Sequence, residues 1–284
     1  MPTLLSLGHG YSARALSRLL IPEGWRVIGT TRSDDKAEAM AAEGVEPVIF
    51  PGGDVESALG EATYLLSSVA PAEDGDPVLM ALGPAIAAAA SNLEWAGYLS
   101  TIGVYGDRAG GWVDEDSDLR PSTSRGERRV AAEAAWATIP GLPLHVFRIA
   151  GIYGPGRGPF EKVRRGTARR IVKEGQVFGR IHVDDIARAL KASMEAPAPG
   201  LAVNLSDDEP APPEDVIAHA ADLLGLPRPP EMAFADADLS PMARSFYAES
   251  KRVRNERLHD LVGDLLHPTY REGLAAILEA EGQA

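Results

Sequence analysis

A glycine-rich turn near the start of the chain constrains its fold more than any other feature. Gly8-His9-Gly10-Tyr11-Ser12-Ala13 follows the apolar run of residues 3–7 and leads into a helical pattern over residues 13–20. An apolar strand, a Gly-x-Gly-x-x-Ala turn and an amphipathic helix form the first βα unit of a dinucleotide-binding fold. The same residues also occur in ordinary strand–helix turns, so the cofactor interpretation depends on the rest of the chain.

Each residue type in this turn suits a bound pyrophosphate. Gly8 permits a tight turn, Gly10 has no Cβ to keep a phosphate from the backbone, and Ala13 allows close packing of helix on strand. The free N–H groups and the dipole of the helix N-terminus favour an anion. The sequence therefore predicts cofactor contacts from six consecutive residues: Gly8, His9, Gly10, Tyr11, Ser12 and Ala13.

Short apolar runs alternate with helical patterns through the first half of the chain. The runs are typical of strands buried on both faces, as in parallel sheets. Strands are expected at 25–30, 45–50, 63–69, 95–101 and 144–149, and helices at 34–43, 79–91 and 128–138. This order predicts an α/β, Rossmann-type doubly wound parallel sheet.

The second half is interrupted by Pro/Gly clusters at 154–156, 197–200, 210–213 and 227–230. Between them we expect helices near 184–195 and 214–224 and a strand near 201–205. We predict an NAD(P)-binding Rossmann domain over residues 1–155. A smaller substrate-side lobe is expected over 156–284, with about 182–206 returning to the Rossmann core.

Composition narrows the function classes. The chain contains 28 Lys+Arg against 41 Asp+Glu, a formal net charge of −13, and no cysteine. This charge disfavours binding to nucleic acid or to an anionic membrane, and the absence of cysteine excludes disulfides and thiol nucleophiles. No apolar run approaches the roughly 20 residues of a membrane span, and no signal peptide is evident, so a cytoplasmic location is expected.

The residues after the second strand predict which nicotinamide cofactor is bound. An acidic residue there would bind the ribose 2′-hydroxyl of NAD, but this chain has Thr31-Arg32-Ser33. Arg32 would pair with a 2′-phosphate, and the two hydroxyls would add hydrogen bonds. NADP is therefore favoured, with NAD and a merely solvated Arg32 as the alternatives. Asp34 and Asp35 are expected to cap and begin the next helix.

Four later segments, in order, resemble the extended short-chain dehydrogenase/reductases, or NAD-dependent epimerase/dehydratase family. They are Leu99-Ser-Thr-Ile-Gly-Val-Tyr-Gly106, Arg148-Ile-Ala-Gly-Ile-Tyr-Gly-Pro-Gly156, Arg180-Ile-His-Val-Asp-Asp-Ile-Ala187 and Asn204-Leu-Ser206. The ending, with residues 241–246 and 268–274, resembles an atypical, uncharacterised bacterial branch that is YeeZ-like. The resemblance implies an oxidoreductase or nucleotide-sugar epimerase/dehydratase-like protein, and by analogy a homodimer.

The resemblance also implies catalytic positions. In the family a Ser/Thr binds the substrate oxygen, and a Tyr-x-x-x-Lys pair on the next helix transfers the proton and holds the cofactor ribose. Thr101 matches the Ser/Thr, whereas Arg125 and Arg129 stand at the tyrosine and lysine positions. Arginine stays protonated and is a poor acid or base, so altered catalysis and lost catalysis both remain open. The alternative function is a non-catalytic NADP-binding regulator or redox sensor.

Further residues receive weaker assignments. Ser68, Val69 and Ala70 match the segment that contacts the adenine ribose, and Arg129 would contact the nicotinamide ribose. Tyr105 and Tyr153 are alternative proton donors, although Tyr105 fits a packing role. No metal is expected, since the histidines are scattered and Asp184 and Asp185 fit as helix caps.

One basic cluster stands out against the acidic background. It includes Arg157, Lys162, Arg164, Arg165, Arg169, Arg170 and Lys173. The cluster predicts either an anionic small-molecule or nucleotide-sugar ligand, or a solvated helix face.

Overall fold

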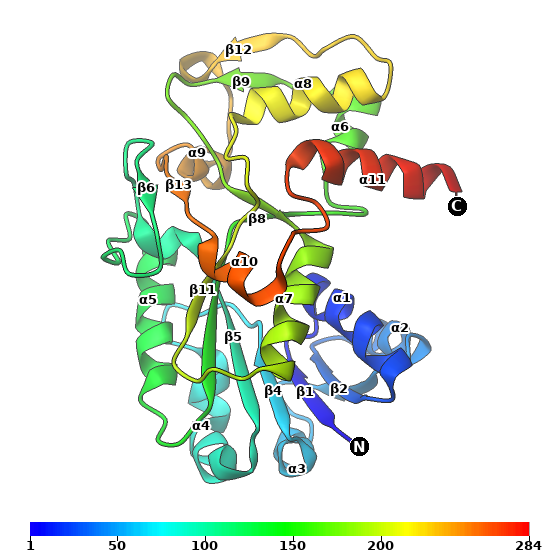
Figure 1. Ribbon diagram of the computed structural model, residues 1–284, viewed down its shortest axis with the longest axis vertical. Helices are drawn as coiled ribbons and strands as arrows, with labels where there is room; N and C mark the ends of the chain where they lie inside the picture. Colours follow the sequence, from blue (N-terminus) through cyan, green and yellow to red (C-terminus); the bar gives the residue numbers. More distant parts are fainter. Residues whose placement is uncertain (284) are drawn as a thin grey trace.

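Seven parallel strands form the central sheet of the computed structural model, which describes residues 1–283 (Figure 1). They are β1 Thr3–Leu7, β2 Arg26–Thr31, β3 Glu46–Ile49, β4 Tyr64–Ser67, β5 Trp95–Thr101, β7 Leu144–Ile149 and β11 Ala202–Leu205. Their order is β11-β7-β5-β4-β1-β2-β3, so the chain reverses direction across the sheet between β1 and β4. Ligands of open α/β sheets bind outside the carboxyl ends of the strands at such a switch point. The predicted doubly wound fold is confirmed.

Helices cover both faces of this sheet because the strands are apolar on both sides. Leu4 of β1 packs with α1 (Tyr11–Leu20) and α7 (Val183–Glu195), whereas its neighbour Leu5 packs with helices on the other face. Those helices are α3 Val55–Glu61, α4 Pro77–Ala89 and α5 Ser124–Ala137. Helix α2, Asp34–Ala42, packs on the same face as α1 through Met40. Successive side chains of a strand point to opposite faces, so each strand contributes to both cores.

The second half adds a smaller lobe beyond the carboxyl ends of the strands (Figure 1). Its core is formed by α6 (Phe160–Arg164), α8 (Pro213–Leu223) and α11 (Tyr270–Gln283). Two parallel strand pairs, β8 Gly151–Tyr153 with β10 Arg180–His182 and β9 Arg170–Val172 with β12 Glu231–Ala233, extend from it. The remaining helices are α9 Pro241–Phe246 and α10 Glu256–Val262.

The chain then returns twice to the Rossmann core. Strand β11 joins the edge of the main sheet beside β7, and α7 packs against α1. Strand β13 (Arg252–Val253) pairs with β6 (Trp112–Val113), which follows β5 in the chain. These returns hold the lobe over the switch point.

Predicted and observed boundaries differ by a few residues. The helix expected at 128–138 begins earlier, at Ser124, because Thr123 caps it by accepting the Gly126 amide hydrogen. Ser33, not Asp34, is the N-cap of α2, and both aspartates lie in its first turn. In residues 1–283, no helix is long and apolar enough to cross a membrane.

Candidate active site

The glycine turn has the geometry that a phosphate loop requires. Gly8 has φ +76°, and a Cβ there would lie 2.8 Å from Cγ2 of Val69. Gly10 is the N-cap of α1 and provides no side-chain hydrogen bond to the helix. A Cβ at Gly10 would meet only the Gly8 carbonyl oxygen, at 3.6 Å, so its exposed surface is open to a ligand. Ala13 lies in the first turn of α1 and is buried. The first amides of α1 are thus left for an anion.

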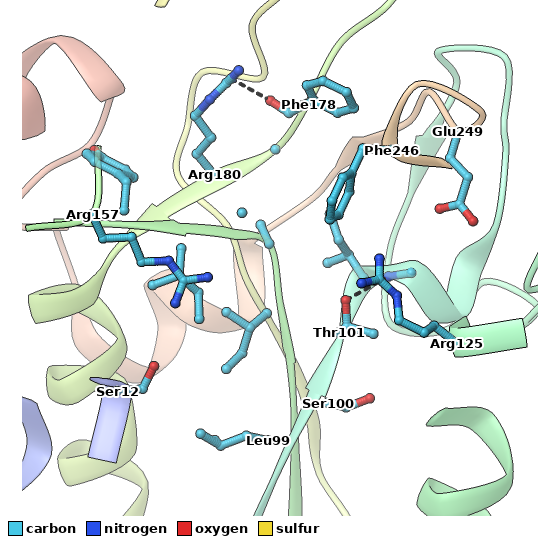
Figure 2. Close-up of a pocket in the computed structure, with 18 of the residues that line it drawn as sticks. Ser12, Leu99, Ser100, Thr101, Arg125, Arg157, Phe178, Arg180, Phe246 and Glu249 are labelled. Atoms are coloured by element: carbon cyan, nitrogen blue, oxygen red, sulfur yellow. Dashed lines mark hydrogen bonds between the residues drawn. The ribbon is translucent and has the colours of Figure 1, made fainter. Parts of the chain in front are cut away.

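A cavity of about 1000 Å³ lies between this loop and the smaller lobe. Gly8, Gly10, Tyr11 and Ser12 line it from the loop, and Ser68 and Ala70 line it after β4. The end of β5 contributes Ser100 and Thr101, which are labelled in the close-up of the cavity in Figure 2. Predicted cofactor and catalytic residues from separate segments therefore share one cavity.

The cavity wall is strongly cationic although the protein is acidic. Its charged residues are the bases Arg125, Arg129, Arg157, Arg180 and Lys251 and the acid Glu249. None of the four arginines has a carboxylate within 4 Å among residues 1–283. Figure 2 shows Arg125 and Arg157 extending into the cavity from different sides. This excess of positive charge favours anionic ligands.

Thr101, Arg125 and Arg129 lie together at one side of the cavity. The Thr101 hydroxyl accepts the Gly103 amide hydrogen at 3.1 Å, which fixes its position. Arg129 donates to the Leu99 carbonyl oxygen at 2.7 Å and to the Tyr98 hydroxyl at 3.1 Å. Arg125 is exposed, and its guanidinium lies 5.0 Å from the ring centroid of Phe246. Arg129 thus ties α5 to β5, and Arg125 keeps its donors available.

A buried polar network supports the β5 edge of the site. Arg148 donates to Glu133 at 3.0 Å and to the Tyr105 hydroxyl at 3.0 Å, and both charged side chains are less than 10% exposed. Ser100 donates to the same carboxylate, and the Tyr105 hydroxyl donates to Asn204 at 2.7 Å. Burial raises the pKa of Tyr105, which fits the packing role expected for it.

The segment predicted to select the cofactor lies outside the cavity lining. Arg32 is exposed just after β2, and no partner is found for it within residues 1–283. Thr31 accepts a 3.5 Å hydrogen bond from the Ser33 amide, and Ser33 accepts one from the Lys36 amide. The two hydroxyls therefore shape the turn, whereas Arg32 is available to a ligand.

His9 and Val69 support the loop from behind and are not part of the cavity wall. His9 is 8% exposed, and neither ring nitrogen has a hydrogen-bond partner among residues 1–283. Burial and the nearby Arg14 lower its pKa to about 4, so the ring is neutral at pH 7. Ser68 donates to the Gly8 carbonyl oxygen and so joins the β4 segment to the loop.

Most of the basic cluster after β7 does not face the cavity. Arg164, Arg165 and Arg170 pair with Glu281, Glu161 and Glu231. Arg157 is the one member that lines the cavity, where it lies 5.6 Å from the ring centroid of Tyr11. For these three arginines the ion pairs favour the alternative of a solvated helix face, and the anionic-ligand alternative stays a prediction.

Sequence reasoning missed three charged residues of the cavity. Arg180 donates to the carbonyl oxygens of Phe178 and Ala211, at 2.9 and 3.0 Å. Glu249 and Lys251 come from a segment of the second half that shows no recognisable motif for chemistry. Arg180 is the first residue of the segment 180–187 that resembles the family, and this was the signal that could have identified it.

The histidines are scattered in sequence, but the structure brings two of them together. His182, Asp184 and His267 place one potential metal-ligand atom each within 4.8 Å of one another. Nδ1 of His182, however, accepts the Asp184 amide hydrogen at 3.2 Å and caps α7. Asp185 is not a cap as expected, because it is buried and accepts the amide hydrogens of Leu266 and His267. The absence of a metal stays a prediction.

Comparisons with known proteins give relatives of different closeness. No family model matches the chain. The structure of a functionally unknown conserved protein from Silicibacter pomeroyi is 57% identical, with a TM-score of 0.94 and 100% of both chains covered. Protein YeeZ of Escherichia coli K12 is 28% identical over 244 residues, covering 81% of this chain and 86% of YeeZ.

Other relatives carry named activities or ligands. A 3-diazoavenalumate denitrifying reductase from Streptomyces is 30% identical over 181 residues, covering 57% of this chain and 58% of the reductase. The structure of MoeE5 in complex with UDP-glucose and NAD has a TM-score of 0.78 at 19% identity, with 99% of both chains covered. The human epimerase family protein SDR39U1, with NADPH, has a TM-score of 0.75 at 19% identity, covering 98% of this chain and 99% of its own. The last two share the fold.

Proposed function

We propose that this chain, which belongs to the NAD-dependent epimerase/dehydratase family of extended short-chain dehydrogenase/reductases, is an NADP-dependent oxidoreductase acting on an anionic small molecule. The observation that carries the proposal is the opening of the glycine loop onto a cavity that also contains Thr101 and five cationic side chains. A dinucleotide on the loop would place its nicotinamide in the same space as a substrate.

The residues present fit a nicotinamide dinucleotide. The amides after Gly10 and the open surface of that glycine suit the pyrophosphate, and Arg157 lies over Tyr11 beside them. Ser68 and Ala70 would contact the adenine ribose, and Arg129 would lie near the nicotinamide ribose. When bound, the cofactor would supply or accept a hydride. Neighbours solved with NAD and with NADPH support this class of cofactor.

Arg32 supports NADP as the preferred cofactor. It follows the second strand, where cofactor specificity is set, and its guanidinium has no competing acid among residues 1–283. A 2′-phosphate would accept two hydrogen bonds from its planar fork. The exposed position also allows the side chain to move to the phosphate.

The cationic wall supports an anionic substrate, with nucleotide sugars as the class to test first. MoeE5, a structural neighbour, was solved with UDP-glucose. Thr101 would donate to the substrate oxygen, and Arg125 would stabilise negative charge that develops on it. Neither Arg125 nor Arg129 can exchange a proton at ordinary pH, so a general acid must come from elsewhere.

A non-catalytic NADP-binding regulator is the second candidate. The observation that favours it is Arg125 itself, which stands at the tyrosine position and stacks on Phe246. Such a protein would bind cofactor in the same loop and would turn over no substrate. A cytoplasmic location and a homodimer remain predictions for either function.

The experiment measures binding of NADP and NAD by calorimetry, followed by hydride transfer with a panel of UDP-sugars and anionic carbonyl compounds. Tighter binding of NADP, together with turnover of at least one compound, is the expected result. Cofactor binding without turnover across the panel favours the regulator. If neither dinucleotide binds, both candidates are wrong.

A further inference from the structure

A buried lysine–glutamate pair lies near the beginning of α5, the helix on which Arg125 stands at the tyrosine position. Lys251 donates to Glu249 at 2.7 Å, and their side chains are only 7% and 12% exposed. Both residues line the cavity. Glu249 also accepts a 2.6 Å hydrogen bond from Ser122, which lies three residues before Arg125. The pair is therefore anchored beside the beginning of α5, the helix end that carries the tyrosine position.

The beginning of α5 is in turn packed against the turn that follows Thr101. A Cβ on Gly126 would lie 2.9 Å from the Gly103 carbonyl oxygen, so only glycine permits this approach. Thr101 itself is bound to the Gly103 amide. Glu249, Arg125 and Thr101 thus lie on the same side of the cavity (Figure 2), and Lys251, which also lines the cavity, is bound to Glu249.

The segment between the two charged residues is held rigidly. The Ser250 amide donates to Asp107 at 2.8 Å, and its hydroxyl donates to the Gly175 carbonyl oxygen at 2.9 Å. Its own carbonyl oxygen accepts the amide hydrogens of Arg108 and Gly110. Strand β13 then begins at the next residue after Lys251. Such anchoring keeps a reactive group in place without reorganisation.

The tyrosines in the cavity wall are poor sources of the proton. Tyr11 donates to the Pro155 carbonyl oxygen at 2.9 Å, and Tyr153 donates to the Thr269 carbonyl oxygen at 3.2 Å. Burial also raises the pKa of Tyr153, Tyr247 and Tyr270. Lys251 has three N–H donors, and Glu249 is the one partner found for them in residues 1–283.

We propose that Lys251 is the catalytic acid that protonates the substrate oxygen, which rests on the proposed function. In carbonyl reduction, the carbonyl carbon accepts the hydride supplied by NADPH, the C=O π bond breaks, and the oxygen takes a proton from Nζ of Lys251. The products are an alcohol, NADP⁺ and a neutral lysine amine. In the oxidative direction the neutral amine accepts the alcohol proton.

Glu249 gives the proton a path back from solvent. Its Oε2 faces Lys251 and its Oε1 faces the exposed Ser122, so the three side chains form a hydrogen-bonded chain from cavity to surface. A proton leaving Lys251 can be replaced in steps: Oε1 of Glu249 takes the Ser122 hydroxyl proton, which water restores, and rotation of the carboxyl group then presents that proton to Lys251. Glu249 also balances the ammonium charge and is a positioning residue.

The test compares Lys251→Arg and Glu249→Gln with the wild-type protein. The probes are 2-oxoglutarate, pyridoxal 5′-phosphate and UDP-sugars, each with its matching NADPH or NADP⁺. Arginine keeps the charge and hydrogen-bond donors but cannot release a proton. We expect Lys251→Arg to lower kcat about 100-fold or more and to change KM by less than about threefold. Lys191→Arg is the matched control, because Lys191 is also paired with glutamate, in its case Glu23 and Glu195, but lies outside the cavity wall.

Glu249→Gln adds a readout that a structural role would not give. Reduction needs the protonated lysine, so the rate falls as pH rises. The variant removes the countercharge, and we expect the falling limb of the pH profile to move to lower pH. Full kcat in Lys251→Arg overturns the assignment while the proposed function stands. No hydride transfer by the wild type with any probe overturns both.

Chemical labelling tests the same placement without turnover. Pyridoxal 5′-phosphate is an anionic aldehyde, and borohydride fixes its imine with a lysine for mass spectrometry. The chain has five lysines: Lys36, Lys162, Lys173, Lys191 and Lys251. We expect Lys251 to be labelled preferentially, and we expect excess NADPH to decrease the extent of this labelling. Labelling confined to the other four contradicts the proposal.

Discussion

Replacing Glu133 by leucine tests the buried network behind the β5 edge. The change leaves the Arg148 side chain, 9% exposed, without its carboxylate and also removes the acceptor of Ser100. Removing one partner of a buried ion pair costs about 3–5 kcal/mol. Arg148 keeps the Tyr105 hydroxyl and the Glu115 carbonyl oxygen as partners, which places the expected cost near 3 kcal/mol.

The double variant Glu133→Leu/Arg148→Met gives the decisive comparison. It removes both charges and leaves Ser100 and the Glu115 carbonyl oxygen without these partners. We therefore expect the double variant to lose about 2 kcal/mol or less of unfolding free energy. Urea unfolding measures each free energy, and the agreement of fluorescence and circular dichroism tests two-state behaviour. The comparison also needs the single variant Arg148→Met. If the losses of unfolding free energy in Glu133→Leu and Arg148→Met simply add in the double variant, the pair is not coupled and the reasoning fails.

Three further predictions concern the cofactor loop and the lobe. Arg32→Ala should weaken NADP binding about 10- to 100-fold in calorimetry, because a charge-assisted pair contributes about 1.5–3 kcal/mol, and should leave NAD binding nearly unchanged; equal losses for both would refute the assignment. Gly273→Ala should destabilise the lobe and alter the cavity, because its Cβ would lie 2.1 Å from the Tyr153 hydroxyl oxygen; an unchanged melting temperature would contradict this. The folded-state pKa of His9, about 4, lies below its unfolded value of about 6.5, so its contribution to stability is present above pH 6.5 and is lost as pH falls toward 4. That loss is on the order of 3 kcal/mol, and urea midpoints of His9→Gln should depend less on pH over this range than those of the wild type.

Local patterns were enough to predict the Rossmann sheet and its phosphate loop. Strand periodicity, the turn at Gly8 and the ordered family segments all act over a few residues, and each predicted element is found close to its expected place. Thr101, Arg125 and Arg129 could be located because β5 and α5 follow each other in the chain. The structure places all three at one cavity.

What the sequence could not predict are contacts between distant segments. The ion pairs that neutralise Arg164 and Arg170 join residues far apart in the chain, and no local pattern records them. The same holds for His182 and His267, whose ring centroids lie 3.9 Å apart. Lys251 and Glu249 reach the cavity through the β6–β13 pairing, a two-residue contact without a recognisable pattern.

That short pairing of β13 with β6 also sets when the site can exist during synthesis. The loop at Gly8 and the strand ends around it are made early, and a growing chain can form them from contacts already available. Lys251 and Glu249 emerge from the ribosome only after most of the chain has been translated. A partly synthesised chain can therefore have the dinucleotide loop but not the closed cavity, and a ribosome that stalls before Lys251 releases a product without the lysine. On the proposed role of Lys251, catalysis would thus depend on near-complete translation, whereas formation of the loop at Gly8 would not.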